Sequence, residues 1–386
     1  MNIKFYILED IIIINYIFKQ WKMKFKKHII IDNGSGCCKA GFNEEEMPKV
    51  IPSYIGYPLF NEKNEFFIGE EAEAIRDKLK LNYPIEQGVV KNWDEMEKIW
   101  SHIFINVLKV DPVEHNIMIS DAIMNPTNHR QKMGEIMFEN FNIPGLYIAF
   151  SPVLSLYNVG KFTGIVVESG EGVTQIAPYL EGLPINNALI RLDFGGRDLT
   201  EYMIRLLIET GNFFSTSNEK EIVRTIKEKA CYTALDFEDE LKAIEPFDYE
   251  LPDEKHVVVK DQRIRCSEAL FKPSMIGKEF KGIAESCYNS IEKCKVDIRK
   301  DFYNTIILSG GSTLFNGLPE RFTKEIKALA SESMKEEVRI IASPQREFGT
   351  WFGGSILSSI STFDSLWITK SEYEESGPDI ILKKCN

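Results

Sequence analysis

Several features that would assign a protein to a narrow class are absent from this sequence of 386 residues. Its seven cysteines form no C-x-x-C pair and have no histidine at metal-binding spacing, so we expect reduced thiols of a cytosolic protein rather than a zinc site or a disulfide framework. The net charge is −12, whereas a general affinity for nucleic acid requires clustered cations. No P-loop or G-x-G-x-x-G motif occurs, which disfavours Walker-type and dinucleotide-binding folds.

A hydrophobic run long enough to span a bilayer is also missing. The apolar stretch at residues 3–18 is interrupted by Glu9 and Asp10, and no small-residue cleavage signal follows it. We therefore expect no membrane span, with a membrane anchor as the less favoured alternative. Residues 1–23 are interpreted as a partner-dependent extension or as a gene-model artefact in which Met23 is the true start.

The composition that remains is that of an ordinary globular protein. Hydrophobic residues make up 44% of the chain and charged residues 27%, and the length allows two or more domains. Residues 1–27 hold six lysines and only two acidic residues, so the negative charge belongs to the rest of the chain. A solvated acidic surface is its simplest explanation.

Two segments that lie 136 residues apart resemble each other. Residues 29–36 read Ile-Ile-Ile-Asp-Asn-Gly-Ser-Gly, and residues 165–172 read Ile-Val-Val-Glu-Ser-Gly-Glu-Gly. A continuous run of β-branched residues is typical of a strand that is buried on both faces. The glycines that follow allow a tight turn whose N–H groups no side chain shields. The pattern predicts two equivalent strand–turn units.

Strands and helices alternate along the remainder of the chain. This order predicts an α/β fold with mostly parallel sheets that carry helices on both faces. We expect strands at 117–120, 146–149 and 305–308, and helices at 95–108, 131–141, 151–159, 197–210, 219–235 and 319–330, with a late helix starting at Trp351.

The two glycine turns suggest a phosphate site. Backbone N–H groups at a strand–turn junction can bind a polyphosphate, and a third glycine turn occurs at 309–313. Asp32 and Glu168 end the two strands, and such carboxylates suit a Mg²⁺ ion that keeps most of its waters. Lys39 is placed to reach a phosphate. Ordinary tight turns that bind nothing remain the alternative.

Many longer motifs then point to one family. They include Cys-Lys-Ala-Gly-Phe at 38–42, Tyr-Pro-Ile-Glu at 83–86, Met-Glu-Lys-Ile-Trp at 96–100, Gly-Arg-Asp-Leu-Thr at 196–200, Leu-Ser-Gly-Gly at 308–311, Gly-Gly-Ser-Ile-Leu at 353–357 and Glu-Ser-Gly-Pro at 375–378. From Lys27 to Cys385 the sequence resembles actin, including divergent actin-like and actin-related proteins.

The resemblance implies an actin-like, ribonuclease-H-like fold with two lobes around a cleft for ATP or ADP with Mg²⁺ or Ca²⁺. The outer lobe would comprise residues 24–158 and 349–386, with a small subdomain at about 54–83. The inner lobe would comprise residues 159–348, with a small subdomain at about 195–278. It also implies the nucleotide contacts, which are Gly34, Ser35, Gly36, Lys39, Ser169, Gly170, Glu171, Gly172, Gly196, Lys227, Glu228, Gly311, Leu314 and Phe315, beside Asp32 and Glu168 at the metal.

The departures from the family pattern fall on the chemistry. The family's glutamine and histidine on either side of the attacking water align with Ser151 and Gln175, and its strand-end aspartate is Glu168. Losing one preorganised donor typically costs about 10²–10³ in rate, so we expect ATP binding with weak or absent hydrolysis. A family lysine near the adenine aligns with Glu347, which reverses the charge there.

Residues that form polymer contacts in the family also differ. The loop between Gly56 and Gly69 is shorter than in actin, and the aromatic that receives it aligns with Leu183. Residues 351–363 and 157–160 match the groove where actin regulators and neighbouring subunits bind. We expect a cytoplasmic, cytoskeletal subunit or cap of an actin-related assembly. An actin-fold ATPase of the chaperone or kinase type, or a nuclear actin-related subunit of a chromatin complex, are the alternatives.

Overall fold

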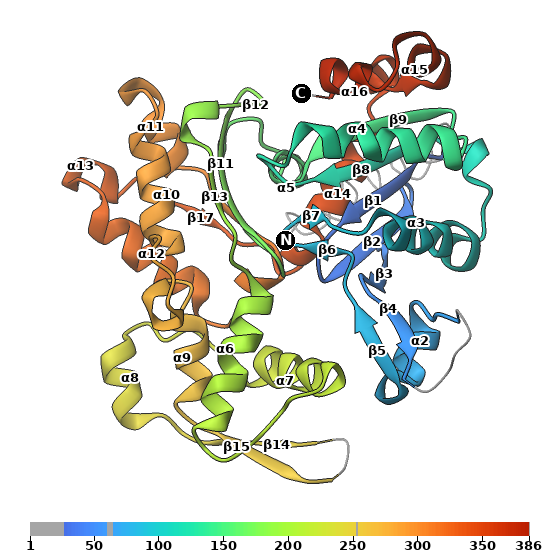
Figure 1. Ribbon diagram of the computed structural model, residues 1–386. Helices are drawn as coiled ribbons and strands as arrows, with labels where there is room; N and C mark the ends of the chain where they lie inside the picture. The colour runs from blue at the N-terminus through green and yellow to red at the C-terminus, as the bar shows by residue number, and fades with distance from the viewer. Residues whose placement is uncertain (1–26, 60–64, 252–253, 386) are drawn as a thin grey trace, which may run out of the picture.

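The computed structural model describes residues 27–59, 65–251 and 254–385, and the chain forms two lobes that are each built on a six-stranded sheet (Figure 1). The sequence-based interpretation of residues 1–23 lies outside these described ranges. Both sheets are mixed and are flanked by helices, so the predicted α/β two-lobed class is confirmed. No helix within the described ranges is long and apolar enough to cross a membrane.

The outer sheet has the strand order β18-β9-β8-β1-β2-β3. Its strands β1, β8 and β9 run parallel, while β2 returns antiparallel to β1 after the first glycine turn. Its strands are β1 (Ile29–Asn33), β2 (Cys37–Phe42), β3 (Lys49–Pro52), β8 (Ile117–Asp121), β9 (Gly145–Phe150) and β18 (Ile368–Thr369).

The inner sheet repeats this arrangement. Its order is β12-β11-β10-β16-β17, with β13 paired to β11; β10 runs parallel to β16, and β11 returns antiparallel to β10 after the second glycine turn. Its strands are β10 (Gly164–Ser169), β11 (Thr174–Leu180), β12 (Leu183–Pro184), β13 (Ile190–Leu192), β16 (Ile306–Ser309) and β17 (Ile340–Ile341). The central strands β1 and β10 are buried over nearly their whole length, as their Ile and Val runs predict.

Helices cover both sheets and continue into a smaller part of each lobe. The outer-lobe helices are α2 (Glu70–Ala74), α3 (Trp93–His102), α4 (Thr127–Glu135), α5 (Ser151–Asn158), α14 (Gly349–Ser358), α15 (Lys370–Ser376) and α16 (Asp379–Lys384). The inner-lobe helices are α6 (Gly196–Ile208), α7 (Ser217–Ala230), α8 (Phe237–Ala243), α9 (Gln262–Glu268), α10 (Ile283–Glu292), α11 (Val296–Tyr303), α12 (Leu318–Leu329) and α13 (Glu332–Lys335).

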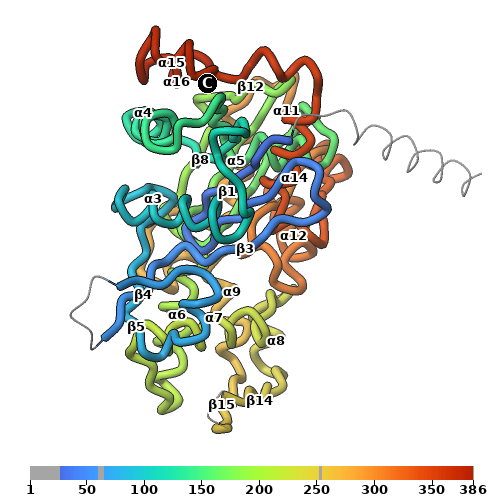
Figure 2. The backbone as a smooth tube through the Cα atoms, turned by 90° about the vertical axis from the view of Figure 1, so that its right-hand side faces the viewer, coloured from blue at the N-terminus to red at the C-terminus, as the bar shows by residue number. Residues whose placement is uncertain are grey.

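Small two-stranded ribbons complete the chain. They are β4 (Ile55–Pro58) with β5 (Leu79–Asn82), β6 (Ile85–Glu86) with β7 (Val89–Val90), and β14 (Phe247–Glu250) with β15 (His256–Val259). In both views β4 and β5 lie at the far end of the outer lobe, and β14 and β15 lie at the corresponding end of the inner lobe (Figures 1 and 2).

Each lobe has its own core, and α5 and α14 pack together between them. The larger core contains β10, β11 and the inner helices, and the second contains β1, β8, β9, α3 and α4. Leu154 of α5 and Trp351 of α14 are buried together with Ile30 of β1, whose carbonyl accepts a 3.2 Å hydrogen bond from the Trp351 indole. These two helices therefore form the structural link beneath the space between the sheets.

Three predicted helices differ from the structure. The helix expected at 219–235 ends at Ala230, because Cys231 is extended and Tyr232 forms a β-bridge with Asn316. The helix expected at 95–108 is α-helical only to His102 and continues as a π-helix over Ile103–Leu108. The helix expected at 131–141 likewise changes to a π-helix over Ile136–Asn140. Helical periodicity alone does not locate such ends and changes of helix type.

Candidate functional site

The site begins at the two glycine turns, which have the same strand register. Asp32 pairs with Lys39 across the β1–β2 hairpin, and Glu168 pairs with Gln175 across the β10–β11 hairpin. Each strand-end acid therefore has one side chain of the returning strand directly beside it. The duplication seen in the sequence thus extends to the pairing partners of the acids.

The tips of the hairpins lie against each other in a reciprocal way. A Cβ on Gly36 would come within 2.8 Å of the Glu171 side chain, and a Cβ on Gly172 would come within 2.5 Å of the Ser35 hydroxyl oxygen. Real Cβ atoms do not approach so closely, so both positions require glycine. The close approach brings the backbone of both turns to the same space.

Asp32, the strand-end acid of the outer sheet, forms an ion pair. The Lys39 ammonium lies 2.9 Å from Asp32 Oδ2, and the Ser120 hydroxyl donates a 2.8 Å hydrogen bond to Asp32 Oδ1. Burial is the largest single influence on Lys39 and opposes its charged form, but Asp32, Cys37 and Glu168 together outweigh burial and raise the Lys39 pKa above its usual value. Lys39 is therefore a permanent cation at this point.

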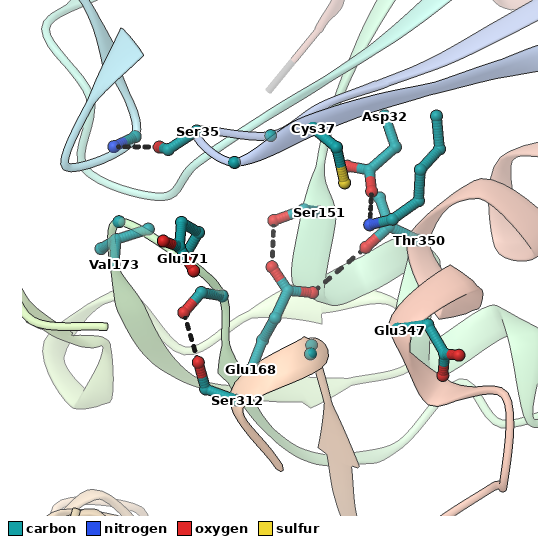
Figure 3. Close-up of a pocket in the computed structure, with 18 of the residues that line it drawn as sticks. Asp32, Ser35, Cys37, Ser151, Glu168, Glu171, Val173, Ser312, Glu347 and Thr350 are labelled. Carbon is teal, nitrogen blue, oxygen red and sulfur yellow. Dashed lines mark hydrogen bonds and ion pairs between the residues drawn. The ribbon is translucent and has the colours of Figure 1, made fainter. Parts of the chain in front are cut away.

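The inner acid is held by neutral donors (Figure 3). Glu168 Oε1 accepts hydrogen bonds from Ser151 Oγ at 2.5 Å and from Gln175 Nε2 at 2.9 Å. Its Oε2 accepts from Ser155 Oγ at 3.0 Å and from Thr350 Oγ1 at 3.2 Å. Burial is the largest influence on this carboxyl and raises the Glu168 pKa. We call these five residues the Glu168 cluster.

A cavity of about 460 Å³ lies between the hairpins and is large enough for a nucleotide-sized ligand. One side is formed by the two glycine turns, and another by the third turn around Gly310 and Gly311. The Ser312 hydroxyl donates a 2.8 Å hydrogen bond to Gly170 O, which fixes the third turn against the second (Figure 3).

Most residues predicted from the sequence line this cavity. They are Asp32, Gly34, Ser35, Gly36, Lys39, Ser151, Glu168, Gly170, Glu171, Gly172, Gln175, Lys227, Glu228, Gly311, Leu314 and Phe315. Ser169 and Gly196 are not among the lining residues. The Ser169 side chain is buried and bonds to Thr174, and the Gly196 carbonyl accepts a 2.8 Å hydrogen bond from the Lys227 ammonium. These two support the lining from behind.

A comparison with protein families agrees with this geometry. The Actin family model matches residues 24–386, which is nearly the whole chain. The chain belongs to the actin family. In this actin-family protein, the two positions that the resemblance assigns to the attacking water, Ser151 and Gln175, are bonded to each other at 3.1 Å and both contact Glu168.

Several residues of the site were missed by the sequence reasoning. Ser155 follows Ser151 by one helical turn, so the i,i+4 spacing on α5 was a usable signal. Ser120, His129 and Thr350 gave no such signal, because they come from β8, α4 and α14 and meet the site only through packing. His129 lines the cavity, and burial lowers its pKa below the usual value.

The two acids differ in their fitness for a divalent cation. A carboxylate has about four lone-pair positions. The cluster donors occupy four on Glu168, whereas the bonds from Lys39 and Ser120 leave two on Asp32. Within the described ranges, no group of three or more His, Cys, Asp or Glu residues is arranged to hold a metal. Asp32 therefore fits a hydrated cation that also binds a ligand's phosphates, and Glu168 does not fit as a direct ligand.

The cavity contains a second unusual carboxylate at Glu347. Glu347 lines the cavity, and its Oε2 atom is buried without a hydrogen-bond partner. The adjacent Arg346 is committed elsewhere, since its guanidinium donates to Thr313 and to the Ser343 carbonyl. A negative group thus stands where the family has a lysine.

Proposed function

We propose that this actin-family chain binds ATP or ADP, with Mg²⁺ or Ca²⁺, in the cavity between its two glycine hairpins. The observation that carries the proposal is the reciprocal approach of the hairpin tips, Gly36 to Glu171 and Gly172 to Ser35. This approach directs the N–H groups of two turns to one space, and such groups bind phosphates well.

The roles within the site follow from the position of each residue. The turns at 34–36 and 170–172 would hold the phosphates, and Lys227, Glu228, Gly311, Leu314 and Phe315 would surround the ribose and base. Asp32 would hold the hydrated cation, which neutralises phosphate charge when it is bound. Ser169 would contribute through its backbone, because its hydroxyl bonds to Thr174, and Gly196 would leave room for the side chains of Glu171 and Ser312.

We further propose that hydrolysis is weak or absent. The Ser151 hydroxyl donates its only proton to Glu168, and the Gln175 amide bonds to Ser151, Glu168 and the Ile123 N–H. Neither group has an N–H or O–H left to donate to a water molecule, and phosphoryl transfer depends on such positioning.

The assembly role is proposed from the family. We propose a division into residues 24–158 with 349–386 and residues 159–348, and the presence of two sheets with separate cores supports it. Partners would be actin or actin-related subunits, in a cytoskeletal setting, and regulators that bind the surface formed by α5 and α14. An apolar residue occurs at every fourth position along and beside α14, at Phe348, Phe352, Ile356 and Ile360. Ile356 and Ile360 are exposed, which supports a binding surface here.

Calorimetry tests nucleotide binding. Purified chain titrated with ATP and with ADP in magnesium buffer should give saturable heat, and inosine titrated alone serves as the ligand control without phosphates. Absence of heat for both nucleotides would overturn the proposal.

A phosphate-release assay at saturating Mg·ATP tests the second part. Turnover well below that of conventional actin, measured in parallel, is expected, and actin-like turnover would contradict it. Sedimentation with Mg·ATP, alone and with conventional actin, then separates a self-polymer, a copolymer and a monomeric subunit.

A further inference from the structure

The Glu168 cluster joins the two lobes. Glu168 and Gln175 belong to strands β10 and β11 of the inner sheet, whereas Ser151 and Ser155 lie on α5 and Thr350 on α14. Every hydrogen bond from Ser151, Ser155 and Thr350 to Glu168 therefore runs from the two linking helices to the inner sheet. Moving these helices away from the inner sheet requires these bonds to break.

Gln175 adds a second crossing. Its Oε1 accepts a 2.6 Å hydrogen bond from the backbone N–H of Ile123, which follows β8 of the outer sheet. Its Nε2 donates to Ser151 and to Glu168. Both N–H groups of the amide are therefore used, and Gln175 is only 2% exposed. Losing it would leave a buried N–H and a buried carboxylate short of partners, which is costly in a low-dielectric interior.

The cluster supplies protein partners for Glu168 in place of a metal ion. Asp32 and Glu168 influence each other electrostatically, and two neighbouring carboxyl groups disfavour ionisation of both. Here the Lys39 ammonium compensates Asp32, and the side-chain donors of the cluster satisfy Glu168. At the floor of the cavity, protein groups thus satisfy the hydrogen-bonding positions of Glu168, and Lys39 offsets the charge of Asp32.

We propose that the Glu168 cluster holds the lobes together at the floor of the cavity without a divalent cation, so that bound nucleotide is retained when the cation is removed. This inference about nucleotide retention rests on the proposed nucleotide binding. A conformation held by protein hydrogen bonds does not depend on metal coordination, and release of the nucleotide is limited by breaking the cluster.

The kinetic test follows release of a fluorescent etheno-ATP into excess ATP, with Mg²⁺ or with excess EDTA. In the native chain EDTA should accelerate nucleotide release by about threefold or less. An effect of this size is what the loss of a weak, solvent-exposed ionic contact would cause. In Gln175→Leu the same treatment should accelerate it by about tenfold or more, because the lobes then depend on the cation. Gln345→Leu, the same replacement at an exposed position outside the cavity, should behave like the native chain.

A second measurement keeps the proposal testable without any nucleotide. Hydrogen exchange of the nucleotide-free chain in EDTA should show protected amides in α5 and β10, with protection reduced about tenfold in Gln175→Leu. Equal acceleration of release by EDTA in native and variant chains, or loss of native protection in EDTA, would overturn the cluster's role. Failure of etheno-ATP to bind while exchange behaves as expected would instead overturn the nucleotide proposal alone.

Discussion

The two glycine hairpins share one strand register but stabilise their buried strand-end carboxylates, Asp32 and Glu168, in different ways. In the outer hairpin, Lys39 neutralises Asp32 across the strand pair at 2.9 Å. In the inner hairpin, the equivalent position is Gln175, which meets Glu168 at the same 2.9 Å but carries no charge. A neutral amide alone does not compensate a buried carboxylate, so hydroxyl donors from α5 and α14 complete the set.

The comparison shows what a duplicated fold keeps and what it leaves free. Strand register and turn length determine which residues face each other, and both are the same in the two halves. The chemistry of the facing pair is independent of that register. One acid therefore retains acceptor positions for an incoming cation, while the other is fully engaged in joining the lobes.

The largest expected effect concerns the charged pair of the outer hairpin. Lys39→Met should lower the free energy of unfolding by about 3–5 kcal/mol, because it leaves Asp32 as a buried charge without its partner. Urea denaturation of the nucleotide-free chain measures the change. Lys242→Met removes an exposed ion pair with Asp239 and should cost about 1 kcal/mol or less. Equal small losses for both variants would show that Asp32 is not compensated by Lys39.

A smaller effect is expected at the tips, where the hairpins should respond alike. Gly36→Val and Gly172→Val should each lower stability by about 1–3 kcal/mol, because the added carbons collide with Glu171 and Ser35, respectively. Both should also weaken nucleotide binding in calorimetry. Ser333→Val on the exposed helix α13 is the control. Unchanged nucleotide affinity in both variants would contradict the reciprocal approach of the turns.

The smallest change in stability is expected at Cys37, where the residue type of the two hairpins differs but no function depends on the difference. Cys37 occupies the position that corresponds to Val173, one residue after the second glycine of its turn. Cys37→Val makes the two positions identical and keeps a similar volume, so thermal unfolding should report a change of less than about 1.5 kcal/mol. A much larger loss would mean that the thiol has a specific role in the outer hairpin.

Much of the site was readable from the sequence because its parts are local. An Ile or Val run, an acid and a G-x-G turn within eight residues are enough to predict a buried strand, a tight turn and an acid beside it. Both copies were predicted in this way, and most of the expected cavity residues line the cavity. The family resemblance supplied the two-lobed fold, which no local pattern reveals.

Tertiary packing alone decided what surrounds the inner acid. Thr350 lies 182 residues from Glu168 and reaches it only because α14 packs on α5, and Ile123 meets Gln175 only because the two sheets face each other. Packing also buried the Ser169 side chain against Thr174 behind the cavity, although Ser169 stands within a predicted motif. Periodicity and turn chemistry act over a few residues, whereas the donors that a buried carboxylate requires come from whichever elements the cores bring together.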